Sequence, residues 1–236
     1  MNIIFRCDPA LTDLLPRPVA AKAALPDWLR QMAPRVPSSV HQRSIRTAKQ
    51  CPPFVDAMTH GFMVLLPCDV VVREGGQFSW NWPLPALAVP AHPRAPMSFH
   101  VPEQLEGSPL AHGTRSALKF NSFWTIELEA GWSLMAVHPI NRDDLPFRLV
   151  TGLVDADRFN EVGINFPAIW SDPGFRGVLP RGTPIAQCYP VPREAPTLVF
   201  DAMTDAQLRG YDTLATQIMS GPGVYRRQHR SKRGPA

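Results

Sequence analysis

Cysteine is scarce in this chain, and the spacing typical of redox or zinc sites does not occur. The four cysteines, Cys7, Cys51, Cys68 and Cys188, lie far apart, and no two of them have C-x-x-C spacing. Scattered cysteines of this kind are typical of reduced thiols inside an intracellular protein. We therefore predict four reduced, buried thiols.

Long apolar runs are also missing. No run approaches the roughly 20 residues that a helix needs to cross a bilayer. Residues 1–16 lack the basic segment followed by an apolar segment that marks a secretory signal peptide. We expect no membrane-spanning helix and a cytoplasmic location.

The common catalytic and nucleotide-binding motifs are absent as well. The sequence contains no G-x-x-x-x-G-K-[ST] loop, no G-x-G-x-x-G, no H-E-x-x-H and no G-x-S-x-G. Seven histidines are scattered along the chain, so folding alone could bring three of them together. One alternative is therefore a metal-dependent oxygenase or hydrolase on a jelly-roll scaffold, with a divalent metal held by His100, His112 or His138.

Proline is what the sequence has in excess. Its 27 prolines are roughly twice the usual share of about 5%. Proline fixes φ and removes a backbone donor, so it ends helices and is excluded from central strands. Many short strands joined by ordered loops fit this composition best.

Short apolar runs separated by turn residues recur from residue 51 onward, which is typical of a sandwich or barrel rather than of βαβ units. We predict a mainly β fold with a single β-barrel, β-clip or jelly-roll-like domain over residues 51–200. A 1–50 extension with a short helix precedes it, and a C-terminal helix (201–224) and a basic disordered tail (225–236) follow. Strands are expected at 62–66, 70–72, 78–82, 97–101, 148–150, 162–166, 177–179 and 185–191.

One β-hairpin is predicted between residues 123 and 138. Two apolar runs, 124–128 and 132–137, flank a turn that contains Gly131. Glycine supplies the positive φ that tight hairpin turns require. The two runs are therefore expected to pair with each other.

Two helices are predicted, one near each end. In the first, residues 25, 28, 29 and 32 are apolar and share one helical face, Pro26 suits the first turn, and Pro34 ends the helix. In the second, Thr204 and Gln207 have capping-box spacing, and Gly221 follows the last turn. Its apolar residues Leu208, Tyr211, Leu214, Ala215 and Ile218 form a stripe along one face.

The basic character of the chain is concentrated at its C-terminus. The net charge is +4, and residues 225–236 contain five Lys or Arg side chains and no acid. Without those five charges the remainder has a net charge of −1. A structural or interaction protein whose 225–236 tail touches nucleic acid is therefore a second alternative.

Polar residues gather between positions 138 and 166. Asn141 and Arg142 follow one apolar strand directly, and Asp155 and Asp157 follow another. Charges at strand ends are held by a rigid scaffold and are therefore candidate site groups. Paired carboxylates can bind a divalent cation, or one of them can act as a base. Arg142 can bind a carboxylate or phosphate through its two-pronged guanidinium.

Two motifs in this region resemble those of trimeric dUTPases. The segment 152–157, G-L-V-D-A-D, is similar to their uracil-binding hairpin, and 181–187, R-G-T-P-I-A-Q, is similar to a later G-x-R-I-A-Q motif. The resemblance covers residues 120–192 and implies a β-clip barrel that forms a trimer. It also implies that Asp155 is the water-activating carboxylate.

The chain departs from the dUTPase pattern at the phosphate-binding positions. Arg158 stands where the family has a stacking Tyr, the P-R-S motif is missing, Pro184 replaces an Arg, and the glycine-rich C-terminal arm is absent. We predict a small, anionic or nucleotide-like ligand and no dUTP hydrolysis. Asp155 and Asp157 are the candidate catalytic or metal-binding groups; the candidate ligand contacts are Asn141, Arg142, Arg158, Asn165 and Trp124.

Most of the chain also resembles an uncharacterised family of bacterial and phage proteins. The segments that carry this resemblance include 49–57, K-Q-C-P-P-F-V-D-A, and 78–82, F-S-W-N-W. The resemblance brings no activity with it. It implies only that the chain is a phage-related or bacterial domain. A homo-oligomer is expected from the dUTPase resemblance alone.

Overall fold

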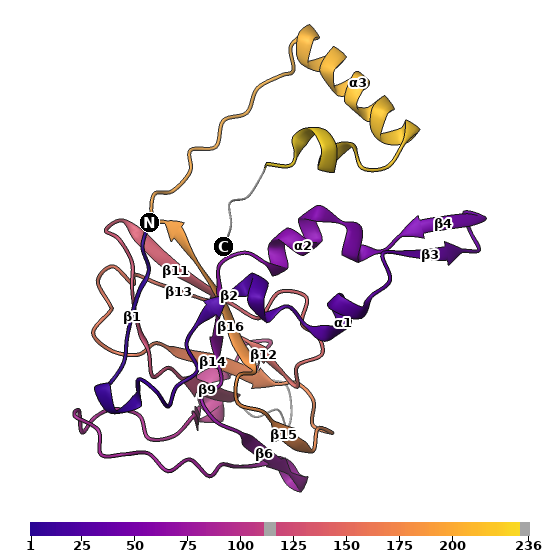
Figure 1. The fold of residues 1–236 in the computed structure, drawn as a ribbon. Helices are drawn as coiled ribbons and strands as arrows, with labels where there is room; N and C mark the ends of the chain where they lie inside the picture. Colours follow the sequence, from indigo (N-terminus) through magenta and orange to yellow (C-terminus); the bar gives the residue numbers. More distant parts are fainter. Residues whose placement is uncertain (111–116, 232–236) are drawn as a thin grey trace. The chain divides into compact units, whose positions relative to one another are not determined.

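The computed structural model describes residues 1–110 and 117–231 (Figure 1). They form two compact units, each built from two segments of the chain. The β unit contains Met1–Gln31 and Ala57–Arg193, and the second unit contains Met32–Asp56 and Glu194–Ala236. The first 31 residues thus belong to the β unit. The extension predicted from the sequence covers residues 1–50.

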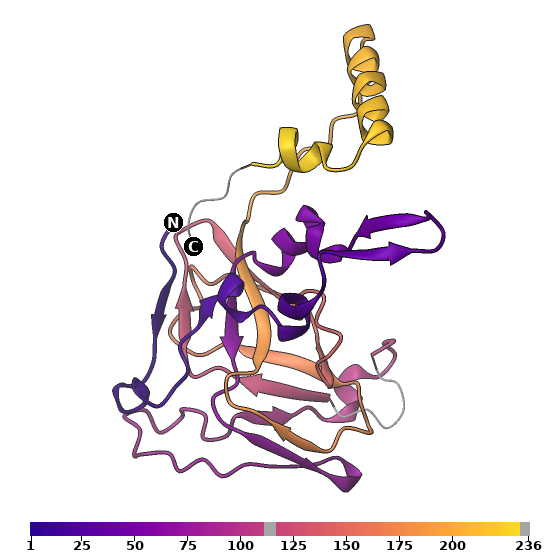
Figure 2. The ribbon, with the colours of Figure 1, turned by 45° about the vertical axis from the view of Figure 1, so that its right-hand side comes forward.

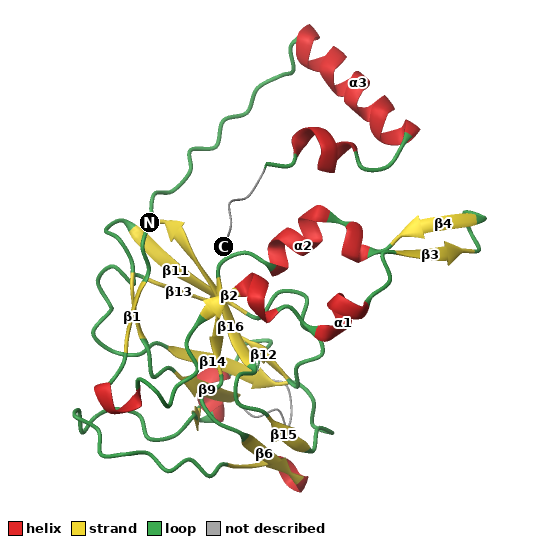
Figure 3. Ribbon diagram, viewed as in Figure 1, coloured by secondary structure: helices red, strands yellow, loops and turns green. Residues whose placement is uncertain are grey.

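Strands dominate the β unit, and all their pairings are antiparallel (Figure 3). The largest sheet has the order β13 (Gly152–Val154), β11 (Trp132–Val137), β16 (Pro184–Pro192), β5 (Phe62–Leu65) and β2 (Val19–Ala20). A second sheet has the order β12 (Phe147–Leu149), β14 (Asn165–Trp170), β9 (Ala117–Asn121) and β8 (Met97–Phe99). Smaller sheets join β15 (Gly177–Leu179), β6 (Val70–Arg73) and β7 (Gln77–Ser79), and pair β1 (Ile4–Arg6) with β10 (Thr125–Glu127).

The mainly β prediction is confirmed, but no closed barrel is found among the described residues. The largest sheet is open, with β13 at one edge and β2 at the other. Short turns and helices connect the strands: η1 (Pro9–Leu11), η2 (Ala21–Ala24), α1 (Asp27–Gln31), η4 (Glu74–Gly76) and η5 (Pro102–Leu105). The helix α1 lies where the first predicted helix was placed, and it buries Leu29.

The predicted hairpin is wrong in its pairing, although both of its strands form. Its first strand, β10, pairs with β1 at the N-terminus, in the register Phe5 to Ile126. Its second strand, β11, pairs with β13 and β16. Gly131 has the expected positive φ of 84°. The turn therefore forms, but strands distant in the sequence outcompete the local partner.

The β unit contains a main hydrophobic core and a smaller second cluster around Leu11, Leu15 and Phe123. Buried aromatic residues from three strands meet in the main core, and the rings of Phe120 and Phe147 pack edge to face with centroids 4.8 Å apart. Phe166 is 1% exposed. Burying such a side chain contributes roughly 1.5–3 kcal/mol. A core of this size holds the strands together in spite of the many prolines at their ends.

The second unit is helical apart from one hairpin. It contains β3 (Arg35–Ser38), β4 (Arg43–Arg46), η3 (Ala48–Gln50), most of α2 (Pro52–Met58), α3 (Asp205–Ser220) and a π-helical turn, η6 (Tyr225–His229). Thr204 caps α3, and the reciprocal bonds of a capping box with Gln207 are both present, as its sequence predicts. No residue of α3 is buried, and Tyr211 in its apolar stripe is 66% exposed.

Part of the basic segment 225–236 has a described conformation. Residues 225–229 form the turn η6, and the Arg230 guanidinium bonds both carboxylate oxygens of Asp56, at 2.6 and 3.1 Å. This bidentate pair fixes residue 230 within the second unit. Positions 232–236 lie outside the described residues.

All four cysteines are free, as predicted, but only two are buried. Burial raises the pKa of the Cys68 thiol to about 11, and burial also raises the pKa of Cys188. Cys7 is half-buried and Cys51 is exposed. The prediction of buried thiols therefore holds for Cys68 and Cys188 only.

Candidate functional site

The Asp155–Asp157 pair lies just beyond β13, where one arginine bridges both carboxylates. Arg193 Nε lies 3.2 Å from Asp155 Oδ1, and Arg193 Nη2 bonds Asp157 Oδ1. Ser133 Oγ donates to Asp155 Oδ1 at 2.6 Å, and the Gly131 amide donates to Asp157 Oδ2 at 3.0 Å. The two aspartates therefore tie the end of β13 to the start of β11 and the end of β16.

These bonds keep both carboxylates ionised. The Ser133 hydroxyl and then the Arg193 guanidinium hold the pKa of Asp155 below its ordinary value. The Arg193 bond and then the Gly131 amide lower the pKa of Asp157. A general base that works near neutral pH needs a raised pKa. The surroundings of Asp155 and Asp157 therefore favour an ion-pair bridge over proton transfer.

The Asn141–Arg142 pair lies at the opposite end of β11 from the two aspartates. Arg142 bonds Asp144 in a bidentate pair, with Nε to Oδ1 at 2.8 Å and Nη2 to Oδ2 at 2.9 Å. Trp28 Nε1 donates to the same carboxylate at 3.4 Å. Asn141 adopts a left-handed backbone with φ of 60°. The charge of Arg142 is thus balanced by Asp144, and the pair anchors α1 to the loop after β11.

The His138 ring lies between two backbone segments and bonds both of them. Its Nδ1 accepts the Leu149 amide at 3.2 Å, and its Nε2 lies 3.0 Å from the Arg142 carbonyl oxygen. An accepting Nδ1 makes Nε2 the protonated nitrogen of a neutral ring. Burial lowers the pKa of His138 and favours that neutral form. Both ring nitrogens are therefore engaged with the backbone.

The other two candidate histidines do not complete a metal site in the described part of the chain. His100 Nδ1 lies 2.7 Å from Gln104 Oε1, and its Nε2 is buried without a described partner. His112 lies outside the described residues. Across residues 1–110 and 117–231, no three His, Cys, Asp or Glu side chains are grouped so that they could hold a metal ion.

The remaining predicted contacts are separated from one another. Trp124 Nε1 donates to the Pro16 carbonyl at 3.1 Å, which ties the β9–β10 connection to the N-terminal segment. Arg158 is exposed in the turn after Asp157. Asn165, at the start of β14, lines a cavity of the β unit. Arg142 lines a different cavity, of about 430 Å³, between α1 and the loop after β11. The structure thus distributes the predicted site residues over several places.

The cavity that Asn165 lines has a volume of about 750 Å³ and is formed by four segments of the β unit. Residues 6–9 and 88–93 provide one part of the lining, and 122–125 and 159–165 provide another. The lining residues are Arg6, Cys7, Asp8, Pro9, Ala88, Val89, Ala91, His92, Pro93, Ser122, Phe123, Thr125, Phe159, Asn160, Glu161, Val162, Gly163 and Asn165. We call it the β1–β14 cavity.

Asp8 fixes one wall of the β1–β14 cavity. This residue is 8% exposed, and its carboxylate accepts the Ala10 amide at 3.0 Å and the Ala88 amide at 2.7 Å. These bonds, with that from Ala10 the larger influence, lower the pKa of Asp8. An ionised carboxylate therefore joins the 88–93 segment to the N-terminal strand, although the two are about 80 residues apart.

A close backbone approach fixes another wall. A Cβ atom at Gly163 would lie 2.2 Å from the Ser122 carbonyl oxygen, so only glycine fits there. The loop before β14 can therefore lie directly against the β9–β10 connection. Phe159 and Val162, on the same loop, are each 52% exposed and line the cavity.

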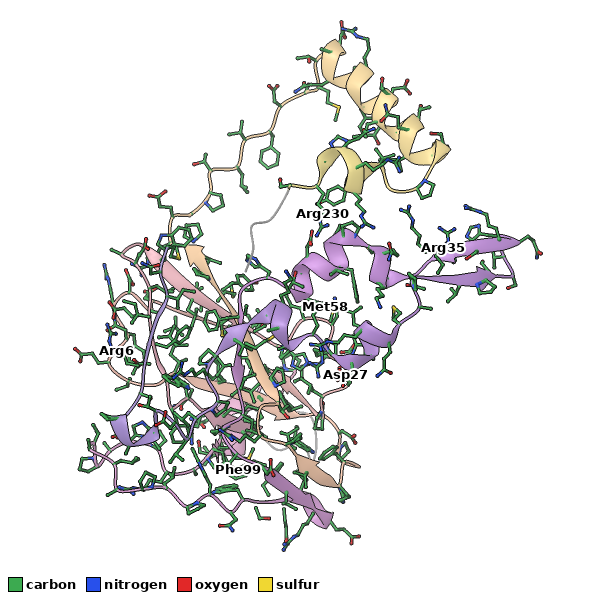
Figure 4. The ribbon with its side chains drawn as sticks, viewed as in Figure 1. Arg6, Asp27, Arg35, Met58, Phe99 and Arg230 are labelled. Carbon is green, nitrogen blue, oxygen red and sulfur yellow. The ribbon has the colours of Figure 1, made fainter. Side chains whose placement is uncertain are left out.

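Two polar side chains of the lining have no hydrogen-bond partner within the described residues. Thr125 Oγ1 is buried without one. Asn165 is exposed and makes no side-chain hydrogen bond to another described residue, although its amide can both donate and accept. Arg6, labelled in Figure 4, ends β1 and pairs with Glu127. The lining therefore combines apolar surface with a few polar groups.

Sequence reasoning missed this cavity because its walls come from segments that carry no shared motif. Residues 88–93 lie in a proline-rich stretch where the sequence predicts no strand, and it predicts none at β1 either. Phe159 gave a weak signal, since a large apolar residue is unusual in a turn segment. Long-range contacts bring these segments together: the pairing of β1 with β10, the Ala88–Asp8 bond and the close approach of Gly163 to Ser122.

No protein-family model matches the chain, and no curated protein matches it. In the described ranges, none of the helices has both the length and the apolar character required to cross a membrane.

Proposed function

We propose that this protein binds a small, nucleotide-like molecule in the β1–β14 cavity. The observation that carries the proposal is the cavity itself. Its volume of about 750 Å³ falls within the roughly 300–1,000 Å³ that is usual for small-molecule sites. Such sites are mostly apolar with a few polar groups that orient the ligand, and this lining has that composition.

The lining favours a ligand with a flat ring and hydrogen-bonding edges. Phe123 and Phe159 offer apolar ring surfaces, and the Asn165 amide can donate to and accept from a nucleobase edge. Arg6 supplies a cation for an anionic group, in competition with Glu127. Satisfying a polar group that has no protein partner adds specificity, because a ligand without the matching edge leaves that group unpaired.

The position of the cavity also supports a relation to the dUTPase β-clip fold. The loop 159–163 follows directly on the G-L-V-D-A-D segment, so the dUTPase-like motif leads into a cavity wall. Hydrolysis is not part of the proposal. Asp155 does not line the cavity, and its bonds to Ser133 and Arg193 keep it ionised.

The test is a thermal-shift screen with two matched variants. Pyrimidine and purine nucleosides, their monophosphates and their triphosphates are the probes. A ligand at about 100 times its Kd adds roughly 2.7 kcal/mol, which shifts the Tm of a domain this size by about 5 °C or more. Val162→Trp fills the cavity mouth and should abolish the shift. Val178→Trp, at a similarly exposed valine that does not line the cavity, should retain it.

The variant Asn165→Leu tests whether the Asn165 amide recognises the base of the ligand, independently of recognition of its charged group. If the Asn165 amide hydrogen-bonds the polar atoms of a nucleobase, this variant should bind nucleosides about tenfold more weakly. That factor is the value expected for the loss of one good hydrogen bond. The proposal fails if no nucleoside or nucleotide shifts the Tm. It also fails if Val162→Trp binds as well as Val178→Trp, since the ligand would then lie elsewhere.

A further inference from the structure

The positive charge of the protein resides in the second unit. That unit contains ten Lys or Arg residues and five Asp or Glu residues, whereas the β unit contains fourteen and fifteen. The formal charges are therefore +5 for the second unit and −1 for the β unit. Because the two units differ in this way, a polyanion would be attracted to the second unit.

Two arginines face each other across the β3–β4 hairpin. Arg35 lies directly opposite Arg46 in the antiparallel register. Like charges at opposed positions destabilise a strand pair. The hairpin has no buried residue, and an isolated two-stranded hairpin is marginal in water. Figure 2 shows the two strands side by side, and Figure 4 labels Arg35 on β3. A bound polyanion would relieve this repulsion.

A third arginine joins the pair through Gly223. A Cβ atom built there would lie 2.7 Å from Arg46 Nη1 and 3.2 Å from Arg227 Nη1, so both guanidinium groups crowd the same point. Gly223 has φ of 91°, a conformation that favours glycine. Its lack of a side chain thus brings a cation from the hairpin next to a cation from the C-terminal segment.

The carboxylate of the segment 32–56 is already paired with an arginine. Asp56 is the one acidic residue of the segment 32–56, and Arg230 pairs with it in a bidentate bond. Arg226 Nη1 donates to Gln50 Oε1 at 3.1 Å, which adds a second tie between the two segments. Within the described residues no carboxylate pairs with Arg35, Arg46, Arg226 or Arg227.

We propose that Arg35, Arg46, Arg226 and Arg227 form a docking surface for the phosphate backbone of a nucleic acid. All four are exposed, and guanidinium groups bind phosphate oxygens through paired hydrogen bonds. A two-stranded ribbon also has the width that enters a major groove. The residues 35–50 carry no Trp, Phe or Leu, the side chains that anchor proteins in a lipid interface, so nucleic acid is favoured over a membrane surface.

Binding of the full-length protein to a fluorescently labelled DNA duplex of mixed sequence tests this surface. Four phosphate contacts predict a slope of log K against log salt of about −4, and each lost contact reduces it by about 1. The double variant Arg46→Gln/Arg227→Gln should therefore bind at least about tenfold more weakly, with a slope near −2. The control is Arg17→Gln/Arg73→Gln, which removes the same charge from exposed positions of the β unit and should bind nearly as tightly as the wild type.

The possible outcomes distinguish DNA binding at these four arginines from an effect of net charge, from membrane binding and from ligand binding in the β1–β14 cavity. Equal weakening in both double variants would show that net charge alone acts, and would overturn it. Absence of DNA binding, or binding to anionic phosphatidylserine vesicles that the same variants remove, would overturn it as well. Circular dichroism on each variant confirms folding, and Arg35→Gln provides an independent third position. The nucleoside screen is unaffected by any of these results.

Discussion

The side-chain amide of Gln187 donates a hydrogen bond of 2.7 Å to the carbonyl oxygen of His60. Gln187 is fully buried on β16, and the same amide donates to the Ala57 carbonyl at 2.9 Å. Its Oε1 accepts the Ile140 amide at 3.0 Å. One polar side chain thus joins the central sheet to two connecting segments, one after α2 and one after β11.

Replacing Gln187 with Leu should destabilise the β unit strongly. The substitution removes the hydrogen bonds of the His60 carbonyl and the Ile140 amide to Gln187, and it leaves the Ala57 carbonyl with only the His60 amide at 3.4 Å. A buried unpaired group costs about 1–3 kcal/mol. We expect a loss of about 2–4 kcal/mol in the free energy of unfolding, measured by urea denaturation. Gln77→Leu, at an exposed strand position, should change it by less than about 0.5 kcal/mol. Equal effects would contradict this bridging role.

His138 should make stability depend on pH near neutrality. Burial lowers its folded-state pKa below the ordinary value, so the unfolded chain binds the proton more readily. The stabilisation is then complete above the unfolded-state pKa and is lost as pH falls through that value towards the folded-state pKa. We expect the free energy of unfolding to decrease between about pH 7.5 and pH 5.5.

The variant His138→Phe checks the cause of that pH dependence. It keeps a ring near Phe147 and removes both hydrogen bonds, so it should lose about 1–3 kcal/mol at pH 8 and show a flatter pH profile. His41→Phe, at an exposed histidine, should keep the wild-type slope. A His138→Phe profile parallel to the wild type would contradict the assignment.

The Arg193 bridge should stabilise the β unit at neutral pH and not at acidic pH. The pKa values of Asp155 and Asp157 are both lowered, so their stabilisation is present above the ordinary carboxyl pKa and disappears as pH falls through the folded-state values. Arg193→Gln should therefore lower Tm at pH 7, and the difference from the wild type should shrink towards about pH 3. Arg158→Gln, on the neighbouring turn, should lower Tm little at either pH.

Asn substitutions at the two aspartates distinguish a role in stability from a role in ligand binding. The side chain of Asp157 is 7% exposed and that of Asp155 is 54% exposed. Asp157→Asn should therefore lower Tm more than Asp155→Asn. If Asp155→Asn instead leaves Tm unchanged and removes nucleotide binding, Asp155 contacts the ligand and the bridging interpretation is incomplete.

Local features of the fold could be predicted from the sequence because they depend on neighbouring residues. The capping box of Thr204 and Gln207 and the turn at Gly131 are examples. The partners of β10 and β11 could not be predicted, because pairing is decided by burial over the whole β unit. Nothing in residues 124–137 indicates that β10 pairs with β1.

The candidate site was predicted less well for the same reason. Asp155 and Asp157 were recognised as paired carboxylates, but Arg193, which bonds both of them, lies just after β16, more than 30 residues later. Asn165 was predicted as a ligand contact and lines the β1–β14 cavity, but other parts of the lining come from residues 6–9 and 88–93, which carried no such prediction. Residues that meet only through long-range pairing leave no periodic signal in a single sequence.

Two glycines with the same backbone conformation should respond differently to a methyl group. Gly61 has φ of 72°, and an added Cβ would lie 2.1 Å from the Cys188 carbonyl oxygen, on the strand that pairs with β5. Gly131 has φ of 84°, and nothing lies within 4 Å of its added Cβ. Left-handed backbone costs a non-glycine residue roughly 1–2 kcal/mol. Gly131→Ala should lose about that amount, and Gly61→Ala should lose about 3 kcal/mol or more, because the β5–β16 pairing must also separate. Urea denaturation of the two variants measures the difference, and equal losses would mean that this pairing can move apart at no cost.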